Sequence, residues 1–127
     1  MEFFIHFLET LFMIGYTYIL LCSNGKYYTG STNDLVLRMQ QHHNGEGAHF
    51  TRKFLPVELK FVEIFERIDY AFNREKQIQG WRRAKKEALI NGNENMLPEL
   101  SKSYQSILIE MGLLSTDNPF DENWERI

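Results

Sequence analysis

The chain has a single cysteine, Cys22, among its 127 residues. One cysteine excludes a disulfide within the chain and any zinc site built from several cysteines. His42, His43 and His49 also lack the spacing of a zinc site. This cysteine usage fits a reducing compartment, and we expect a cytoplasmic protein. No internal repeat or low-complexity tract is present, and the length suits one domain with a hydrophobic core.

The N-terminus lacks both a membrane span and the features of a signal peptide. Residues 1–13 are apolar, with Phe3, Phe7 and Leu11 at helical spacing. The stretch is too short to cross a bilayer, Glu9 interrupts it, and it has no basic start or small-residue cleavage site. We expect an extra amphipathic segment that docks on the domain or on a protein partner. The alternative is an over-extended start, with Met13 beginning the domain.

The charge is low overall but unevenly distributed. The net charge is −3, which taken globally argues against nucleic-acid binding. Residues 13–91, however, hold twelve Lys/Arg and eight Asp/Glu, whereas residues 92–127 hold two and seven. A basic body with an acidic tail is one pattern of nucleic-acid-binding proteins. The tail is a second candidate surface for a protein partner.

The order of elements predicts an α+β fold with a small three-stranded antiparallel sheet flanked by helices (β-β-α-β-α-α). Strands are expected at 16–22, 26–30 and 57–65. Helices are expected from a cap among Thr32, Asn33 and Asp34 to about His43, from a capping Asp69 to about Gln79, and over 81–90. Residues 48–56 are expected to form a basic loop, residues 97–104 a closing turn and residues 105–113 a further helix. The predicted divisions are an N-terminal segment 1–13, a domain 14–104 and an acidic, partly disordered tail 105–127.

The loop between the first two strands decides which tyrosines share a face. A two-residue Asn24-Gly25 turn would place Tyr18 and Tyr28 on opposite faces of the hairpin. A three-residue loop that begins at Ser23, with Gly25 left-handed in a bulge, would place them on the same face. We predict the three-residue loop, because the function inferred below needs both rings on one face.

Two positions in the first predicted helix could bind phosphate. Arg38 and His42 are four residues apart and therefore share a helix face. A guanidinium suits a phosphate or the charge that develops on it. The alternative is a surface Arg38 paired with Asp34, which is also four residues away.

Glu75 is the candidate metal ligand. In the second predicted helix, Ala71, Phe72 and Ile78 mark the inward face, and Glu75 falls on or beside it. A carboxylate there is costly unless it is paired or bound to a metal, and hard divalent cations prefer oxygen ligands. The alternative is a structural ion pair with an arginine such as Arg38.

Tyrosines and basic residues complete the candidates. Strand tyrosines such as Tyr16, Tyr18, Tyr27 and Tyr28 are usually packing residues. A run of cations is usually a solvated face, but it can also bind a phosphate backbone. The candidate nucleic-acid-binding residues are Lys53, Arg74, Lys76, Arg82, Arg83, Lys85 and Lys86.

Together these residues form a recognisable pattern. Tyr16-Thr17-Tyr18, then Tyr28-Thr29-Gly30, then Arg38 and Glu75, resembles the GIY-YIG nuclease superfamily. The chain is most similar to small stand-alone members related to the N-terminal domain of the excinuclease C subunit. The matching stretches are YTYILLCSNGKYYTGSTNDLVLRMQQH and REKQIQGWRRAKKEALI, within residues 14–91.

The resemblance implies a metal-dependent endonuclease that hydrolyses phosphodiester bonds in DNA, in repair or processing. Tyr18 would take or orient the proton of the attacking water, and Tyr28 would help to position the water or the phosphate. Arg38 would stabilise charge on the phosphate, and His42 would assist. Glu75 would bind one divalent cation, Mg²⁺ or Mn²⁺, acting as a Lewis acid.

Two departures from the family pattern keep other functions open. Ser31 stands where the excinuclease-type domain has a lysine, and Glu87 stands about where many members have an asparagine. These losses favour a nucleic-acid-binding module with weak or no catalysis as the alternative. A third reading is an interaction protein that docks through its N-terminal segment or its acidic tail.

Overall fold

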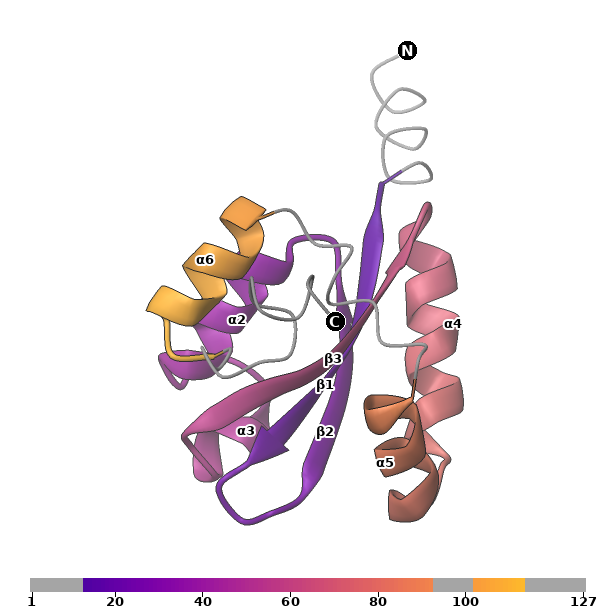
Figure 1. Ribbon diagram of the computed structural model, residues 1–127, viewed down its shortest axis with the longest axis horizontal. Coiled ribbons are helices and arrows are strands. Elements are labelled where there is room, and N and C mark those ends of the chain that lie inside the picture. The colour runs from indigo at the N-terminus through magenta and orange to yellow at the C-terminus, as the bar shows by residue number, and fades with distance from the viewer. Residues whose placement is uncertain (1–12, 93–101, 114–127) are drawn as a thin grey trace, which may run out of the picture.

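The computed structural model describes residues 13–92 and 102–113 (Figure 1). The expected helix over the first twelve residues, positions 97–101 of the closing turn and the acidic end after residue 113 lie outside this part. The elements in chain order are β1 (Gly15–Cys22), β2 (Tyr27–Thr32), α2 (Leu35–His43), α3 (His49–Lys53), β3 (Val57–Phe65), α4 (Ile68–Gln79), α5 (Arg83–Asn91) and α6 (Lys102–Glu110). Within the described residues no helix is long and apolar enough to cross a membrane.

The three strands form one antiparallel sheet in the order β2-β1-β3, so the expected α+β class is confirmed. The central strand β1 is buried along most of its length because it is paired on both edges. Figure 1 shows α2, α3 and α6 on one side of the sheet and α4 and α5 on the other. β2 and β3 are the edge strands of the sheet, and the chain passes from β2 into α2 after two residues.

The hairpin has the predicted three-residue loop. The backbone N–H of Cys22 donates to the carbonyl of Lys26 at 2.9 Å, and the N–H of Gly25 donates to the carbonyl of Cys22. Gly25 has φ of 81°, a left-handed conformation that suits glycine. In this register Tyr18 pairs with Gly30 and Leu20 pairs with Tyr28. Directly paired residues share a face, so both tyrosines lie on the same face, as predicted.

Each face of the sheet has its own core. On the α2 side, Tyr18 and Leu20 of β1 pack with Leu35 and Met39 of α2. On the α4 and α5 side, Ile19 and Phe61 pack with Ile78 and Leu89. Alternation of side chains along β1 produces this division, because successive residues point to opposite faces.

The residues around α6 belong to the first core. Leu108 and Leu113 are fully buried in it. The N–H of Leu59 in β3 donates to the carbonyl of Leu113 at 2.8 Å. The packed part of the chain therefore includes residues 106–113, which the sequence analysis assigned to the tail.

Three expected boundaries were wrong. The expected loop 48–56 contains the short helix α3, which is held by the buried Thr51 and by the Phe50–Phe54 ring contact, with centroids 5.1 Å apart. Asp69 does not cap α4. The helix begins one residue earlier, and Asp69 forms an ion pair with Arg67. Helix α5 begins at Arg83 rather than at residue 81, because Trp81 closes a turn onto Ile78.

Candidate active site

A buried chain of hydrogen bonds links β1, α2 and α3. The Tyr18 hydroxyl lies 2.7 Å from Nε2 of His42, and Nδ1 of His42 lies 2.9 Å from Oγ1 of Thr51. The Thr51 hydroxyl donates its proton to the carbonyl of Ala48 at 2.9 Å. Thr51 Oγ1 must therefore accept from His42, which places the histidine proton on Nδ1. Nε2 is then the acceptor, and the Tyr18 hydroxyl donates to it.

Two glycines make room for this chain. A Cβ on Gly30 would collide with the Tyr18 hydroxyl, and a Cβ on Gly47 would collide with Nδ1 of His42. Gly30 is the glycine of the second tyrosine motif, and in β2 it is directly paired with Tyr18 of β1. A glycine is needed at this position because the Tyr18 ring packs against the β2 backbone in the space that a side chain would fill.

Burial keeps both members of the Tyr18–His42 pair neutral. Burial, and then the positive charge of Arg38, lower the pKa of His42 to about 4. Burial raises the pKa of Tyr18 well above its ordinary value, although nearby Arg38 opposes the shift. At neutral pH the pair is therefore a phenol donating to a neutral imidazole.

Arg38 and Tyr28 lie beside this pair. The Tyr28 ring centroid is 5.4 Å from that of His42 and 6.4 Å from that of Tyr18. Burial raises the pKa of Tyr28, Arg38 lowers it, and Glu75 raises it further. Because these charges act on Tyr28 and also on Tyr18, all five predicted catalytic residues belong to one electrostatic neighbourhood.

Neither expected alternative for Arg38 is seen in the described part of the chain. Asp34 caps α2 instead, accepting from the N–H of Leu37 at 3.1 Å. The Arg38 guanidinium donates to the amide oxygen of Gln41 at 3.0 Å. In residues 13–92 and 106–113, no carboxylate lies within ion-pair distance of Arg38. Its charge is thus available to an anion.

Two neutral donors hold Glu75. The Ser31 hydroxyl donates to one carboxylate oxygen at 2.7 Å, and the Gln79 amide donates to the other at 2.9 Å. Both donors lie on the same side of the sheet as α4. The described residues contain no group of three or more His, Cys, Asp or Glu side chains that could hold a metal. A cation bound at Glu75 would have few side-chain ligands from the described residues, which suits Mg²⁺, because Mg²⁺ is usually bound by one or two carboxylates, keeps several waters and binds substrate phosphates.

The two departures from the family pattern have defined partners. Ser31, at the lysine position, is the donor to Glu75. Glu87, at the asparagine position, forms an ion pair with Arg83 at 2.7 Å within α5.

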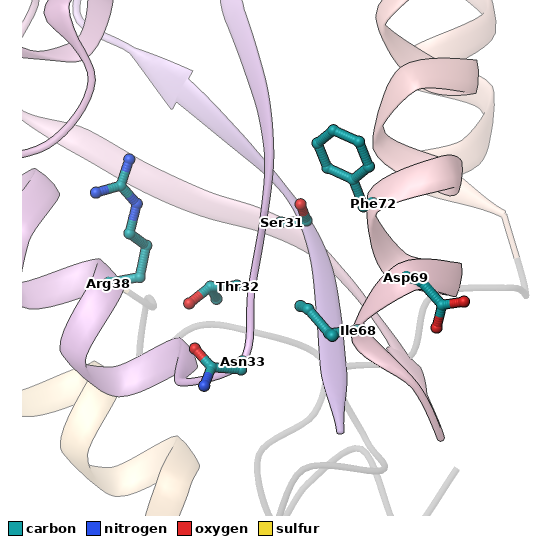
Figure 2. Close-up of a pocket in the computed structure, with 7 residues that line it drawn as sticks. All are labelled: Ser31, Thr32, Asn33, Arg38, Ile68, Asp69 and Phe72. Carbon is teal, nitrogen blue, oxygen red and sulfur yellow. The ribbon is translucent and has the colours of Figure 1, made fainter. Parts of the chain in front are cut away.

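An open pocket of about 530 Å³ adjoins these residues (Figure 2). Arg38 approaches from α2, and Ile68, Asp69 and Phe72 approach from α4, on opposite sides of the end of β2. Ser31 lines the pocket and also donates to Glu75, so it connects the two. The pocket is lined by Ser31, Thr32, Asn33, Arg38, Ile68, Asp69 and Phe72.

The expected inward face of α4 was wrong at one position. Ala71 and Ile78 are fully buried, but Phe72 is 47% exposed. The helix turns Ala71 toward β1, where its carbonyl accepts from the buried Thr17 hydroxyl at 2.7 Å. Phe72, the next residue, is rotated by about 100° away from that contact.

The predicted nucleic-acid-binding cations do not form one patch. Lys53 is in α3, on the α2 side of the sheet, whereas the other six lie in α4 or α5 or just before α5. Arg74 pairs with Glu63 at 2.8 Å and lies over Trp81, and Arg83 lies over Tyr27. The ammonium groups of Lys76 and Lys85 lie over the rings of Phe72 and Trp81. Arg82 is exposed just before α5, and Lys86 is half-buried in it.

Sequence reasoning missed four contributors to the site: Ser31 as a Glu75 donor, Gln79, Thr51 and Phe72. Gln79 is four residues after Glu75, a helical spacing that could have identified it. Thr51 had no such signal, because its contact with His42 depends on a helix that the sequence did not predict.

Comparisons with known proteins place the chain in a family. A family model described as the GIY-YIG catalytic domain matches residues 14–88. A UPF0213 protein of Halobacterium salinarum is 43% identical over 75 residues, which are 59% of this chain and 97% of that one. A UPF0213 protein of Bacillus pumilus is 41% identical over 59% of this chain and 76% of its own.

One solved structure also matches. The solution structure of a UPF0213 protein from Bacillus halodurans is 37% identical, covers 61% of this chain and 83% of its own, and has a TM-score of 0.42. The family match spans both tyrosine motifs, Arg38, His42 and Glu75. The chain therefore belongs to the GIY-YIG family and is a relative of the UPF0213 proteins.

Proposed function

We propose that this protein is a divalent-metal-dependent endonuclease that hydrolyses phosphodiester bonds in DNA. The observation that supports this most is that one electrostatic neighbourhood contains a buried Tyr18–His42 hydrogen bond, an arginine with no carboxylate partner in the described residues and a half-buried Glu75 held by neutral donors. A site of this kind combines a proton acceptor, a phosphate ligand and a cation ligand. The role that we propose for this activity is in DNA repair or processing.

Glu75 would hold Mg²⁺ or Mn²⁺, oriented by Ser31 and Gln79. The bound cation would act as a Lewis acid on the phosphate and stabilise the leaving oxygen. The Ser31 and Gln79 donors fix the carboxylate without neutralising it, so its full charge is kept for the cation.

Tyr18 and His42 would move the proton of the attacking water. As the water oxygen bonds to phosphorus, its proton passes to the Tyr18 oxygen and the phenol proton passes to Nε2 of His42. The imidazolium that forms still donates its Nδ1 proton to Oγ1 of Thr51. The ester bond to phosphorus then breaks, the leaving oxygen takes a proton from solvent, and His42 returns its proton through Tyr18 to solvent.

Arg38 would link substrate binding to this transfer. Tyr18 is fully buried, and Arg38 lies beside its hydroxyl. When the guanidinium binds the phosphate, it would shift from the Tyr18 hydroxyl toward the anion and place positive charge where the transition state is negative. Partial neutralisation of Arg38 by phosphate also removes one cause of the low pKa of His42, which makes the imidazole a better base. Tyr28, half-buried beside Arg38, would position the phosphate or the water.

A cleavage assay with matched variants tests this function. Labelled single-stranded, duplex, flap and junction DNAs are incubated with Mg²⁺ or Mn²⁺ and wild type, Glu75→Gln or Glu66→Gln. Glu66 is an exposed carboxylate between β3 and α4 and serves as the control. We expect metal-dependent cutting by wild type and Glu66→Gln, and none by Glu75→Gln. Cutting that survives in Glu75→Gln would reject the residue assignments.

The second candidate is a nucleic-acid-binding module of the same fold. It is favoured by the contacts that Ser31 and Glu87 make with other protein side chains, at positions where the family resemblance implies a lysine in the excinuclease-type domain and an asparagine in many members. DNA binding without cleavage, whichever divalent metal is added, would support the nucleic-acid-binding module instead of the nuclease.

A further inference from the structure

The pocket beside Glu75 has two chemically different sides. Arg38 and Ser31 belong to the proposed phosphate and cation site. Ile68 and Phe72 of α4 form an apolar side that hydrolysis of the phosphodiester does not use. In Figure 2 the Phe72 ring projects from α4 on the side where Ser31 lies. The proposed hydrolysis therefore assigns no role to Ile68 and Phe72.

Phe72 is an exposed aromatic side chain at the edge of the pocket. Nearly half of it is exposed, although it lies in a helix that buries Ala71 one residue earlier. The Lys76 ammonium lies 4.8 Å from its ring centroid. An exposed aromatic ring with a cation close by is the combination that single-stranded nucleic acid uses, in which bases stack on rings and cations follow the backbone.

We propose that Phe72 stacks an unpaired nucleobase adjacent to the phosphate held at Arg38 and Glu75. The proposal rests on the proposed function and specifies its substrate class as single-stranded or locally unpaired DNA. In a duplex both faces of each base are covered by neighbouring bases, so a base must leave the stack before it can reach Phe72. Single strands and unpaired positions need no such step.

The size and lining of the pocket agree with one nucleotide. Its volume of about 530 Å³ lies within the range of about 300–1,000 Å³ typical of small-ligand sites. Arg38 at one end suits a phosphate, and Ile68 and Phe72 at the other suit a base. Asn33 adds an amide to the lining, a group that can hydrogen-bond to base edges.

Binding measured without metal tests the proposal separately from catalysis. The probes are a short mixed-sequence DNA single strand with one 2-aminopurine base and the same sequence as a duplex, in buffer with EDTA. Phe72→Leu removes the ring but keeps an apolar side chain, and Phe72→Tyr keeps the ring. Tyr70→Leu is the control, because Tyr70 is also an exposed aromatic of α4 with a cation, Arg67, over its ring, but it does not line the pocket.

We expect Phe72→Leu to weaken single-strand binding by roughly 5- to 150-fold, the effect of one lost base–aromatic stack. Phe72→Tyr and Tyr70→Leu should bind like wild type, and duplex affinity should not depend on Phe72. The 2-aminopurine signal should change on binding in wild type but not in Phe72→Leu. Equal losses in Phe72→Leu and Tyr70→Leu, no loss in either, or an equal loss on duplex would overturn the proposal.

The cleavage assay with Glu75→Gln separates the two proposals. Phe72-dependent single-strand binding without metal-dependent cutting would refute the nuclease and keep the base site. Metal-dependent cutting with single-strand affinity unchanged in Phe72→Leu would refute the base site and keep the nuclease.

Discussion

The Tyr18 hydroxyl donates to Nε2 of His42 at 2.7 Å, and neither side chain has exposed surface. Thr51 sets the direction of this hydrogen bond. Its hydroxyl donates to the carbonyl of Ala48 and so accepts from Nδ1 of His42, which leaves Nε2 as the acceptor for Tyr18. His42, with its tautomer fixed, is thus the proton acceptor for the tyrosine of the first motif. Several consequences of this arrangement can be measured.

Thr51 should hold the histidine tautomer. Thr51→Val removes the acceptor for Nδ1–H and leaves a buried polar group without a partner, so we expect a loss of about 1–3 kcal/mol of unfolding free energy. Thr51→Ser keeps the hydroxyl and should lose less. Chemical denaturation measures the stability, and ¹⁵N shifts of the His42 ring report which nitrogen is protonated. An Nε2–H tautomer in wild type would contradict the assignment.

The stability of the protein should fall with acid because of His42. Its pKa is about 4 in the folded protein, below the ordinary value of 6.5, so the unfolded chain binds the proton more readily between these pH values. The contribution of neutral His42 to the free energy of unfolding is fully present above pH 6.5 and is lost progressively as the pH falls toward 4. The slope contributed by one such group is at most about 1.4 kcal/mol per pH unit.

Urea unfolding between pH 4 and 7.5 measures this slope. His42→Gln should make the profile shallower, because glutamine does not titrate. His43→Gln, the exposed neighbour in α2, should leave the profile unchanged. The same slope in all three proteins would show that His42 does not control it.

Gly30 should be essential for the position of Tyr18. The Cβ of Gly30→Ala would collide with the Tyr18 hydroxyl, which is held in the sheet and cannot move freely. We expect overpacking of this kind to cost about 1–3 kcal/mol of unfolding free energy and to lower activity. Gly80→Ala is the control, because its Cβ would meet only the carbonyl oxygen of Gln77 at 3.6 Å. Denaturation and cleavage assays on both variants compare the two positions.

The sequence predicted well what depends on local pattern. The strand Val57–Phe65 and the three-residue loop ending at Gly25 follow from apolar alternation and from the left-handed position that glycine favours. α3 was missed because Ala48 provides no side-chain cap, and the five-residue helix depends on the burial of Thr51. Asp69 was assigned as a cap from its residue type, but Arg67 competes for its carboxylate.

Some residues of the candidate site could be named from the sequence, and others could not. The two tyrosine motifs, Arg38, His42 and Glu75 could be named from the sequence because the family resemblance aligned them. The Ser31–Glu75 contact could not, because it joins segments 44 residues apart. Thr51 could not, because its contact with His42 depends on α3, and Phe72 could not, because its exposure depends on which side of α4 packs on the sheet. Such contacts depend on tertiary packing, which the periodicity of one segment does not specify.

Ser31 and Gln79 should determine how strongly Glu75 holds its cation. Each donates to a different carboxylate oxygen, at 2.7 Å and 2.9 Å, so each restricts the orientation of the ligand. Loss of such an orienting partner typically costs about 10- to 100-fold in metal affinity or activity. We therefore expect Ser31→Ala and Gln79→Ala to raise the Mg²⁺ concentration needed for half-maximal cleavage, with less change in the rate at saturating metal. Gln77→Ala is the matched control, since Gln77 lies in the same helix and contacts Arg74 instead. A lower rate at every Mg²⁺ concentration, with the half-maximal concentration unchanged, would indicate that these donors act on the substrate rather than on the cation.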